Sequence, residues 1–126
     1  MGRARSHFKS LGYKVEDHSA TRPYDLCCTR GNETIFVEVK GTRGLGATVI
    51  VTRGEVEFAR NAPVALLFIV SNVTVTKGKH PRVSGGEVTT INAWANEPSL
   101  SPIAFRLDLS AAPILAEKPQ VKRAAG

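Results

Sequence analysis

Residues 24–41, YDLCCTRGNETIFVEVKG, decide the fold of this chain. Two runs rich in β-forming residues flank a turn at residues 30–33, and Gly-Asn at the centre of so short a link is typical of a hairpin. Because successive side chains on a strand point to opposite faces, the second run places Glu38 and Lys40 together, on the face opposite to its valines. The stretch therefore predicts two antiparallel strands with a charged patch on one face.

Two segments outside this hairpin carry helix signals. Residues 4–11 space their apolar side chains at helical intervals, and Gly12 is a typical helix end. Further on, Thr52 and Glu55 form a T-x-x-E capping box, which predicts that a helix begins there and runs to about residue 61. The first of these helices carries basic residues and no acidic one.

The remaining strand-like runs complete an α/β plan. Val64 to Val70, VALLFIV, is apolar throughout, as expected of a strand that is covered on both faces of a sheet. The runs that we predict as strands are residues 13–16, 24–29, 34–40, 48–51, 64–70 and 105–109, with one more short element within residues 88–94. This order favours an α/β fold with a mixed central β-sheet flanked by helices, in one domain over residues 1–110. We expect residues 111–126 to be a flexible basic tail.

Composition narrows the class of protein. The 126 residues are 42% apolar, enough for a buried core, and no apolar run approaches the ~20 residues that a membrane span needs. The two cysteines are adjacent and offer no disulfide framework, which favours a reducing compartment, so we expect a cytoplasmic protein without a membrane partner. The net charge of +6 favours a polyanionic partner, most often a nucleic acid.

Three charged residues around the hairpin carry the chemistry that we infer. Glu38 and Lys40 interrupt a strand where a continuous apolar run would be more stable, and such a departure from the local pattern is typical of a functional site. Asp25 lies on the neighbouring strand. Two carboxylates on adjacent strands suit Mg²⁺, which prefers oxygen ligands and leaves positions for water and a substrate phosphate. A lysine beside them adds positive charge near the attacking water.

The same residues resemble a known family pattern. Asp25, followed after a spacer by Glu38-Val39-Lys40, is similar to the signature of the PD-(D/E)XK nuclease superfamily. The wider stretch, with Glu38 to Thr42, then Val51 to Glu55 and an apolar strand, resembles the NO VEIN C-terminal-type domain, a branch that occurs in bacterial restriction-type and helicase-containing proteins. The resemblance covers roughly residues 8–109.

This resemblance implies a restriction-endonuclease-like core and metal-dependent cleavage of phosphodiester bonds in DNA, in restriction, defence or repair. Asp25 and Glu38 would bind Mg²⁺, for which Mn²⁺ can substitute, together with the main-chain carbonyl of Val39. Lys40 would orient or deprotonate the water, which makes Asp25, Glu38 and Lys40 the expected catalytic residues. The implied partners are DNA and, beside it, a second copy of the chain or a helicase, ATPase or recognition module.

Five basic residues are candidates for contact with nucleic-acid phosphates. They are Arg43 in a glycine-rich loop, Arg53 at the start of the second helix, and Lys77, Lys79 and Arg82 in a long loop. Ordinary solvated surface charge is the alternative for each of them.

Simpler interpretations stay open for the candidate site as well. Glu38 and Lys40 fit a solvated strand face with an ion pair, Asp25 fits a turn or strand edge, and the capping box alone explains Glu55. Many relatives carry an acidic residue on the first helix, and this chain has none there. The alternative function is therefore a non-catalytic module that keeps the nuclease fold and binds nucleic acid or a protein. Action on RNA in place of DNA is a further alternative.

Overall fold

The structure is a computed structural model that describes residues 1–44, 48–96, 98 and 100–110. The helices are α1 (Gly2–Ser10) and α2 (Arg53–Asn61), with a 3₁₀ helix η1 (Trp94–Asn96). The strands are β1 (Lys14–Asp17), β2 (Leu26–Arg30), β3 (Glu33–Gly41), β4 (Ala65–Ser71), β5 (Thr74–Val75), β6 (Val83–Ser84) and β7 (Glu87–Asn92). Five of them form one sheet in the order β1-β2-β3-β4-β7, while β5 and β6 form a separate two-stranded ribbon.

The sheet is mixed, as the sequence predicts. β2 and β3 pair antiparallel with Arg30 opposite Glu33, so residues 31 and 32 form a two-residue turn. Gly31 adopts a φ of +59° there, a conformation that favours glycine. β3 and β4 are parallel because α2 connects them, and β4 pairs antiparallel with β7. The prediction of an α/β fold with a mixed central sheet between helices is confirmed.

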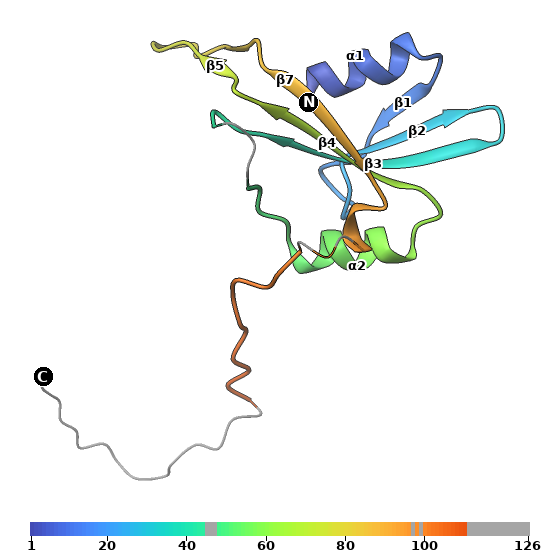
Figure 1. The fold of residues 1–126 in the computed structure, drawn as a ribbon, viewed down its shortest axis with the longest axis vertical. Coiled ribbons are helices and arrows are strands. Elements are labelled where there is room, and N and C mark those ends of the chain that lie inside the picture. The colour runs from blue at the N-terminus through green and yellow to red at the C-terminus, as the bar shows by residue number, and fades with distance from the viewer. Residues whose placement is uncertain (45–47, 97, 99, 111–126) are drawn as a thin grey trace, which may run out of the picture.

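β4 is buried on both faces, as its uniformly apolar sequence predicts. Alternate residues of β4 pack into two separate cores, one beneath α1 and the other beneath α2 and η1 (Figure 1). The α1 core contains Ala4, Phe8, Tyr13, Leu26, Cys28, Val37, Phe68 and Val70. The α2 core contains Ala59, Ala65, Leu67, Ile69, Trp94 and Ala95. Two small cores on opposite sides of one sheet therefore hold the three layers together.

The helix signals are borne out. Thr52 Oγ1 accepts a hydrogen bond from the main-chain N–H of Glu55 at 3.1 Å, and Glu55 Oε1 accepts one from the N–H of Thr52 at 2.9 Å, so both halves of the capping box are present. α1 ends at Ser10, and Gly12 follows with a φ of +89°. No helix in the described part of the chain is long and apolar enough to cross a membrane.

Two of the predicted strands are wrong. Residues 48–51 form no strand, because Val49 and Val51 pack against the α2 core instead of pairing with a neighbour. Residues 105–109 form no strand either, and Phe105 is 99% exposed. Alternating apolar residues make a strand only where another strand supplies hydrogen bonds and a core covers one face. The predicted tail, residues 111–126, lies outside the described residues, as do residues 45–47 of the glycine-rich loop.

The two-core arrangement predicts a sharp contrast between two phenylalanines. Phe68 is 0% exposed at the centre of β4, so Phe68→Ala should lower the free energy of unfolding by roughly 3–5 kcal/mol. Phe105→Ala, the matched control, should leave it within about 0.5 kcal/mol because the ring contacts solvent. Urea denaturation followed by circular dichroism measures both. Equal losses for the two variants would contradict the placement of residues 105–109.

Candidate active site

Lys40 lies at the centre of a cluster of charged side chains on the α2 face of the sheet. Its Nζ is 3.2 Å from Glu38 Oε2 and 3.2 Å from Glu55 Oε1. Glu38 is only 5% exposed, and most of the Lys40 side chain is covered as well. The contact joins β3 to the first turn of α2.

Strand register explains why these side chains meet α2. Glu38 pairs with Leu67 of β4 and Lys40 with Ile69, and both β4 residues belong to the α2 core. Side chains of directly paired residues lie on the same face of a sheet. The alternation that the sequence predicts for β3 is therefore confirmed, and the charged face is the one that α2 covers.

Asp25 lies beside Glu38, just before β2 and not on the strand as the sequence predicts, because β2 begins at Leu26. Its carboxylate Oδ2 accepts a hydrogen bond from the main-chain N–H of Val39 at 2.8 Å, which holds the Asp25 side chain against β3. The negative charge of Asp25 also contributes to the raised pKa of Glu38, so the two acids are close enough to interact. The structure thus brings together the three residues that the sequence singled out.

The Glu38 carboxyl is strongly perturbed. Burial is the main cause, followed by the charge of Asp25 and a hydrogen bond shared with Glu55, and together they raise the pKa of Glu38 to about 8. Burial acts to lower the pKa of Lys40, but the charges and hydrogen bonds of Glu38 and Glu55 outweigh it and raise that pKa. Burial acts to raise the pKa of Glu55, and hydrogen bonds from Thr52, Glu38 and Lys40 bring it below its usual range. Three carboxyl groups, those of Asp25, Glu38 and Glu55, therefore share the one ammonium of Lys40.

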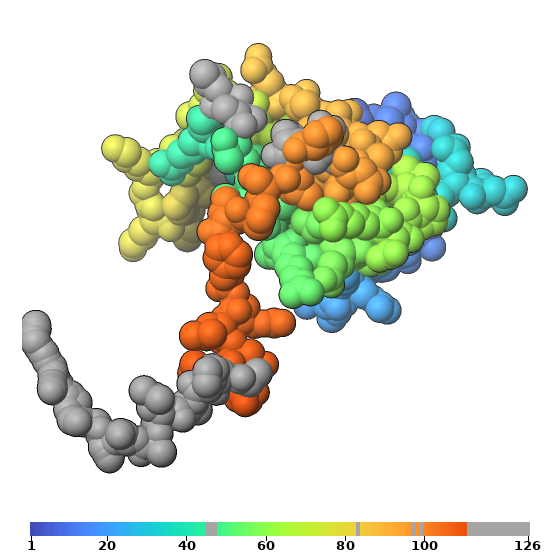
Figure 2. Space-filling view, turned by 60° about the horizontal axis from the view of Figure 1, so that its bottom comes forward, coloured from blue at the N-terminus to red at the C-terminus, as the bar shows by residue number. Residues whose placement is uncertain are grey.

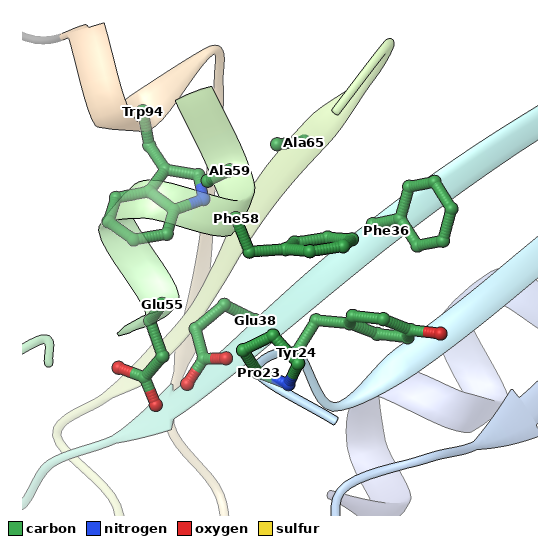
Figure 3. Close-up of a pocket in the computed structure, with 9 residues that line it drawn as sticks. All are labelled: Pro23, Tyr24, Phe36, Glu38, Glu55, Phe58, Ala59, Ala65 and Trp94. Carbon is green, nitrogen blue, oxygen red and sulfur yellow. The ribbon is translucent and has the colours of Figure 1, made fainter. Parts of the chain in front are cut away.

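A small pocket opens beside the cluster, between α2 and the sheet. It is lined by Pro23, Tyr24, Phe36, Glu38, Glu55, Phe58, Ala59, Ala65 and Trp94. Figure 3 shows the carboxylates of Glu38 and Glu55 at one end, with the ring of Phe58 over that of Tyr24. The centroids of those two rings are 4.7 Å apart. The cavity volume is about 10 Å³, room for roughly one water molecule. Its walls are aromatic and its charged end is acidic.

Glu55 is the site residue that sequence reasoning missed. The capping box accounts for its hydrogen bond with Thr52, but the same oxygen, Oε1, also contacts Lys40. A signal for this second role was available in the helix spacing. Phe58 and Ala59 follow Glu55 at i+3 and i+4, so Glu55 lies on the apolar face that α2 turns toward the sheet.

The donor atoms suit a hard cation with few protein ligands. Within the described residues, no group of three or more His, Cys, Asp or Glu side chains is arranged to hold a metal ion. Asp25 and Glu38 form a pair instead, and Mg²⁺ is often bound by one or two carboxylates with water and substrate completing its shell. Burial and the charge of Asp25 raise the pKa of Glu38, and a cation bound there would oppose both effects by favouring the ionised carboxylate. The carbonyl of Val39 as a third ligand stays a prediction.

The five basic candidates fall into two groups. Arg53 Nε lies 2.7 Å from Glu57 Oε1, so its charge is already paired on the surface of α2. Arg43 is exposed in the loop after β3, and the other three lie in the connection between β5 and β6. The loop contacts the segment that leads into β5 through the hydrogen bond from Asn72 N–H to Gly44 O at 2.7 Å.

The fold and the cluster define an α/β protein with a buried carboxylate–lysine site on a mixed sheet. Residues 1–84 match the family described as Protein NO VEIN, C-terminal, and the chain belongs to that family. The match spans the whole cluster and confirms the branch that the sequence resemblance indicated, whereas membership of the PD-(D/E)XK superfamily stays a prediction. Comparison with curated proteins found no match, and neither did comparison with solved structures.

The perturbed carboxyl predicts an unusual pH dependence of stability in metal-free protein. Between its ordinary pKa of 4.5 and its folded value of about 8, Glu38 binds a proton more tightly in the folded state than in the unfolded chain. Its contribution to the free energy of unfolding is therefore largest at low pH and is lost as the pH rises through this window.

Urea denaturation in EDTA from about pH 5 to 8 measures this effect. Glu38→Gln cannot titrate, so the stability of the variant relative to wild type should increase as the pH rises. Glu57→Gln, which removes an exposed carboxylate on α2, should follow the wild-type curve. Parallel curves for wild type and Glu38→Gln would contradict the buried, proton-binding state of Glu38.

Proposed function

We propose that this chain is a Mg²⁺-dependent endonuclease domain that hydrolyses phosphodiester bonds in DNA. The observation that carries the proposal is the convergence of two carboxylates, Asp25 and Glu38, with the ammonium of Lys40 around β3. Glu38 is buried, and burial together with the charge of Asp25 disfavours its ionised form unless a cation is bound beside it.

Each residue has a role that follows from its contacts. Asp25 and Glu38 are the residues that would hold the ion, and Asp25 is already fixed against β3 by the N–H of Val39. When bound, Mg²⁺ polarises a phosphoryl oxygen and lowers the pKa of a water molecule. Lys40 directs its N–H donors into the cluster, where they orient the attacking water and stabilise negative charge that develops on the phosphate.

Glu55 acts through Lys40. It shares the ammonium with Glu38 at 3.2 Å, and its own position is fixed because the same oxygen caps α2. A lysine held on two sides keeps a single position relative to the acids, which favours a fixed site for the attacking water. We therefore assign Glu55 as a positioning residue.

DNA as substrate rests on charge. The chain has a net charge of +6, and its exposed cations include Arg43 and the basic residues of the ribbon. A nucleic-acid backbone is the polyanion that such a surface most often binds.

A second candidate function is a non-catalytic module that keeps this fold and binds nucleic acid. Two observations favour it. α1 contributes no acidic residue, and Lys40 already pairs with both Glu38 and Glu55. Calorimetric titration separates the candidates: the nuclease binds Mg²⁺ or Mn²⁺, whereas the module binds DNA with no heat from either metal.

The nuclease predicts that three substitutions stop cleavage. Asp25→Asn, Glu38→Gln and Lys40→Met should each lower the rate of plasmid nicking in Mg²⁺ or Mn²⁺ by ~100-fold or more, because each removes a charge that acts in the transition state. The substitutions keep side-chain volume, and circular dichroism with urea denaturation checks that each variant is folded under the assay conditions. Cleavage at the wild-type rate by all three variants would refute the site.

The role of Glu55 predicts a loss of rate without a loss of fold. Glutamine also serves at this position of a capping box, so Glu55→Gln should keep α2 while Lys40 loses one of its two carboxylates. We expect kcat to fall by ~10–100-fold with KM nearly unchanged. Glu57→Gln, two residues away on the same helix, is the matched control and should cut at the wild-type rate. Equal rates for both variants would assign Glu55 to capping alone.

A further inference from the structure

The strands β5 and β6 form a ribbon that projects from the main sheet (Figure 1). Thr74 pairs with Ser84, and beyond the strands Thr76 and Arg82 continue the contact. The N–H of Thr76 donates to Arg82 O at 2.8 Å, and the N–H of Arg82 donates to Thr76 Oγ1 at 2.8 Å. The connection is therefore closed at its base by hydrogen bonds.

Positive charge gathers at the tip of this ribbon. Lys77, Lys79 and Arg82 are all exposed, and no acidic residue occurs between Asn72 and Gly86. Among the described residues, none of these three cations has an ion-pair partner within 4.0 Å, in contrast to Arg53. The tip thus carries three cations that are available to an external anion.

The first leg of the ribbon is fixed to the strand that carries the cluster. The N–H of Val73 donates to Thr42 O at 3.2 Å, just past the end of β3, and the N–H of Thr42 donates to Val70 O of β4 at 2.9 Å. Figure 2 shows the ribbon beside the loop that follows β3, which includes Arg43.

The second leg is fixed by close packing. Gly86 lies so near β4 that a Cβ there would be 2.7 Å from Ser71 O, which leaves no room for another residue. From α1, Arg3 Nη1 donates to Gly85 O at 2.9 Å and to Gly86 O at 3.2 Å. Because both legs are held, the direction of the ribbon relative to the cluster is set by the fold.

The ribbon begins close to the cluster. Val73, the residue before β5, donates to Thr42 O, and Thr42 follows Lys40 by only two residues. A duplex with a scissile bond at the cluster can therefore also contact the ribbon.

We propose that the β5–β6 ribbon is an arm that grips the phosphate backbone of a DNA duplex beside the cluster. The use of DNA rests on the proposed function, but the grip itself needs neither metal nor cleavage. An anionic membrane is the weaker partner, because the tip, Lys77 to Arg82, offers no large apolar side chain for insertion between lipids.

The test uses duplex binding without divalent ions, in a Glu38→Gln background that does not cleave. Fluorescence anisotropy with a 20-base-pair duplex gives the binding constant over a series of salt concentrations. Lys77→Gln, Lys79→Gln and Arg82→Gln combined should reduce the slope of log K against log salt by about 2–3, since each phosphate contact contributes about 0.9. Lys79→Gln alone should reduce it by about 0.9.

The matched control removes the same charge elsewhere. Arg5→Gln, Lys9→Gln and Lys14→Gln combined change exposed cations on α1 and β1, and should leave the slope nearly unchanged. Equal effects of the two triple variants would overturn the arm, because net charge alone would then explain binding. An unchanged slope for the ribbon triple variant would also overturn the arm. The same holds if that variant loses binding to phosphatidylserine vesicles while its duplex binding stays intact.

This test separates the arm from the nuclease. If the wild-type chain never cuts DNA in Mg²⁺ or Mn²⁺ while the ribbon variant still loses duplex binding, the arm stands and the nuclease fails. If cleavage depends on Asp25 and Glu38 while the ribbon variant binds duplex like wild type, the nuclease stands and the arm fails.

Discussion

The ammonium of Lys40, 3.2 Å from Glu38 and 3.2 Å from Glu55, is the contact on which both the fold and the site depend. An isolated charge on a covered sheet face is costly, so each partner needs the others. The Glu55 oxygen that binds Lys40 also caps α2, which ties the start of that helix to β3. A shift of α2 along the sheet would expose a helix end and leave buried charges unpaired. The same contacts therefore fix both the position of α2 and the geometry of the cluster.

The contacts of Lys40 do not balance the acidic groups of the cluster. Asp25 adds a further carboxylate, whose charge acts together with burial, the larger cause, to raise the pKa of Glu38 to about 8. If the ion pair of Lys40 and Glu38 served stability alone, Asp25 would add no stability to it. Yet the Asp25 side chain is held in place by the N–H of Val39. An acid that is fixed beside a buried acid raises the affinity of the site for cations at the expense of stability. This trade favours a cation-binding role over a structural one.

Short-range patterns predicted much of this architecture, and long-range packing accounts for what they missed. The turn at residues 31 and 32, the charged face of β3 and the capping box each depend on residues a few positions apart, so sequence spacing revealed them. Glu55 reaches Lys40 only because β3 and β4 run parallel and α2 packs across them, which no local pattern encodes. Residues 105–109 alternate like a strand but lack a neighbouring strand to pair with. Alternation states a preference, and only tertiary contacts decide whether it is realised.

The two candidate functions make the same use of the ribbon and differ in their use of the cluster. A phosphate that approaches the cluster meets more carboxylate than ammonium, so direct contact is unfavourable until a cation lies between them. The exposed cations of the ribbon attract the same phosphate without that barrier. A module that only binds nucleic acid would have use for the ribbon and none for buried acids, which apolar residues would replace with a gain in stability. In the proposed nuclease, Asp25 and Glu38 beside Lys40 would serve to bring a cation and a phosphate together.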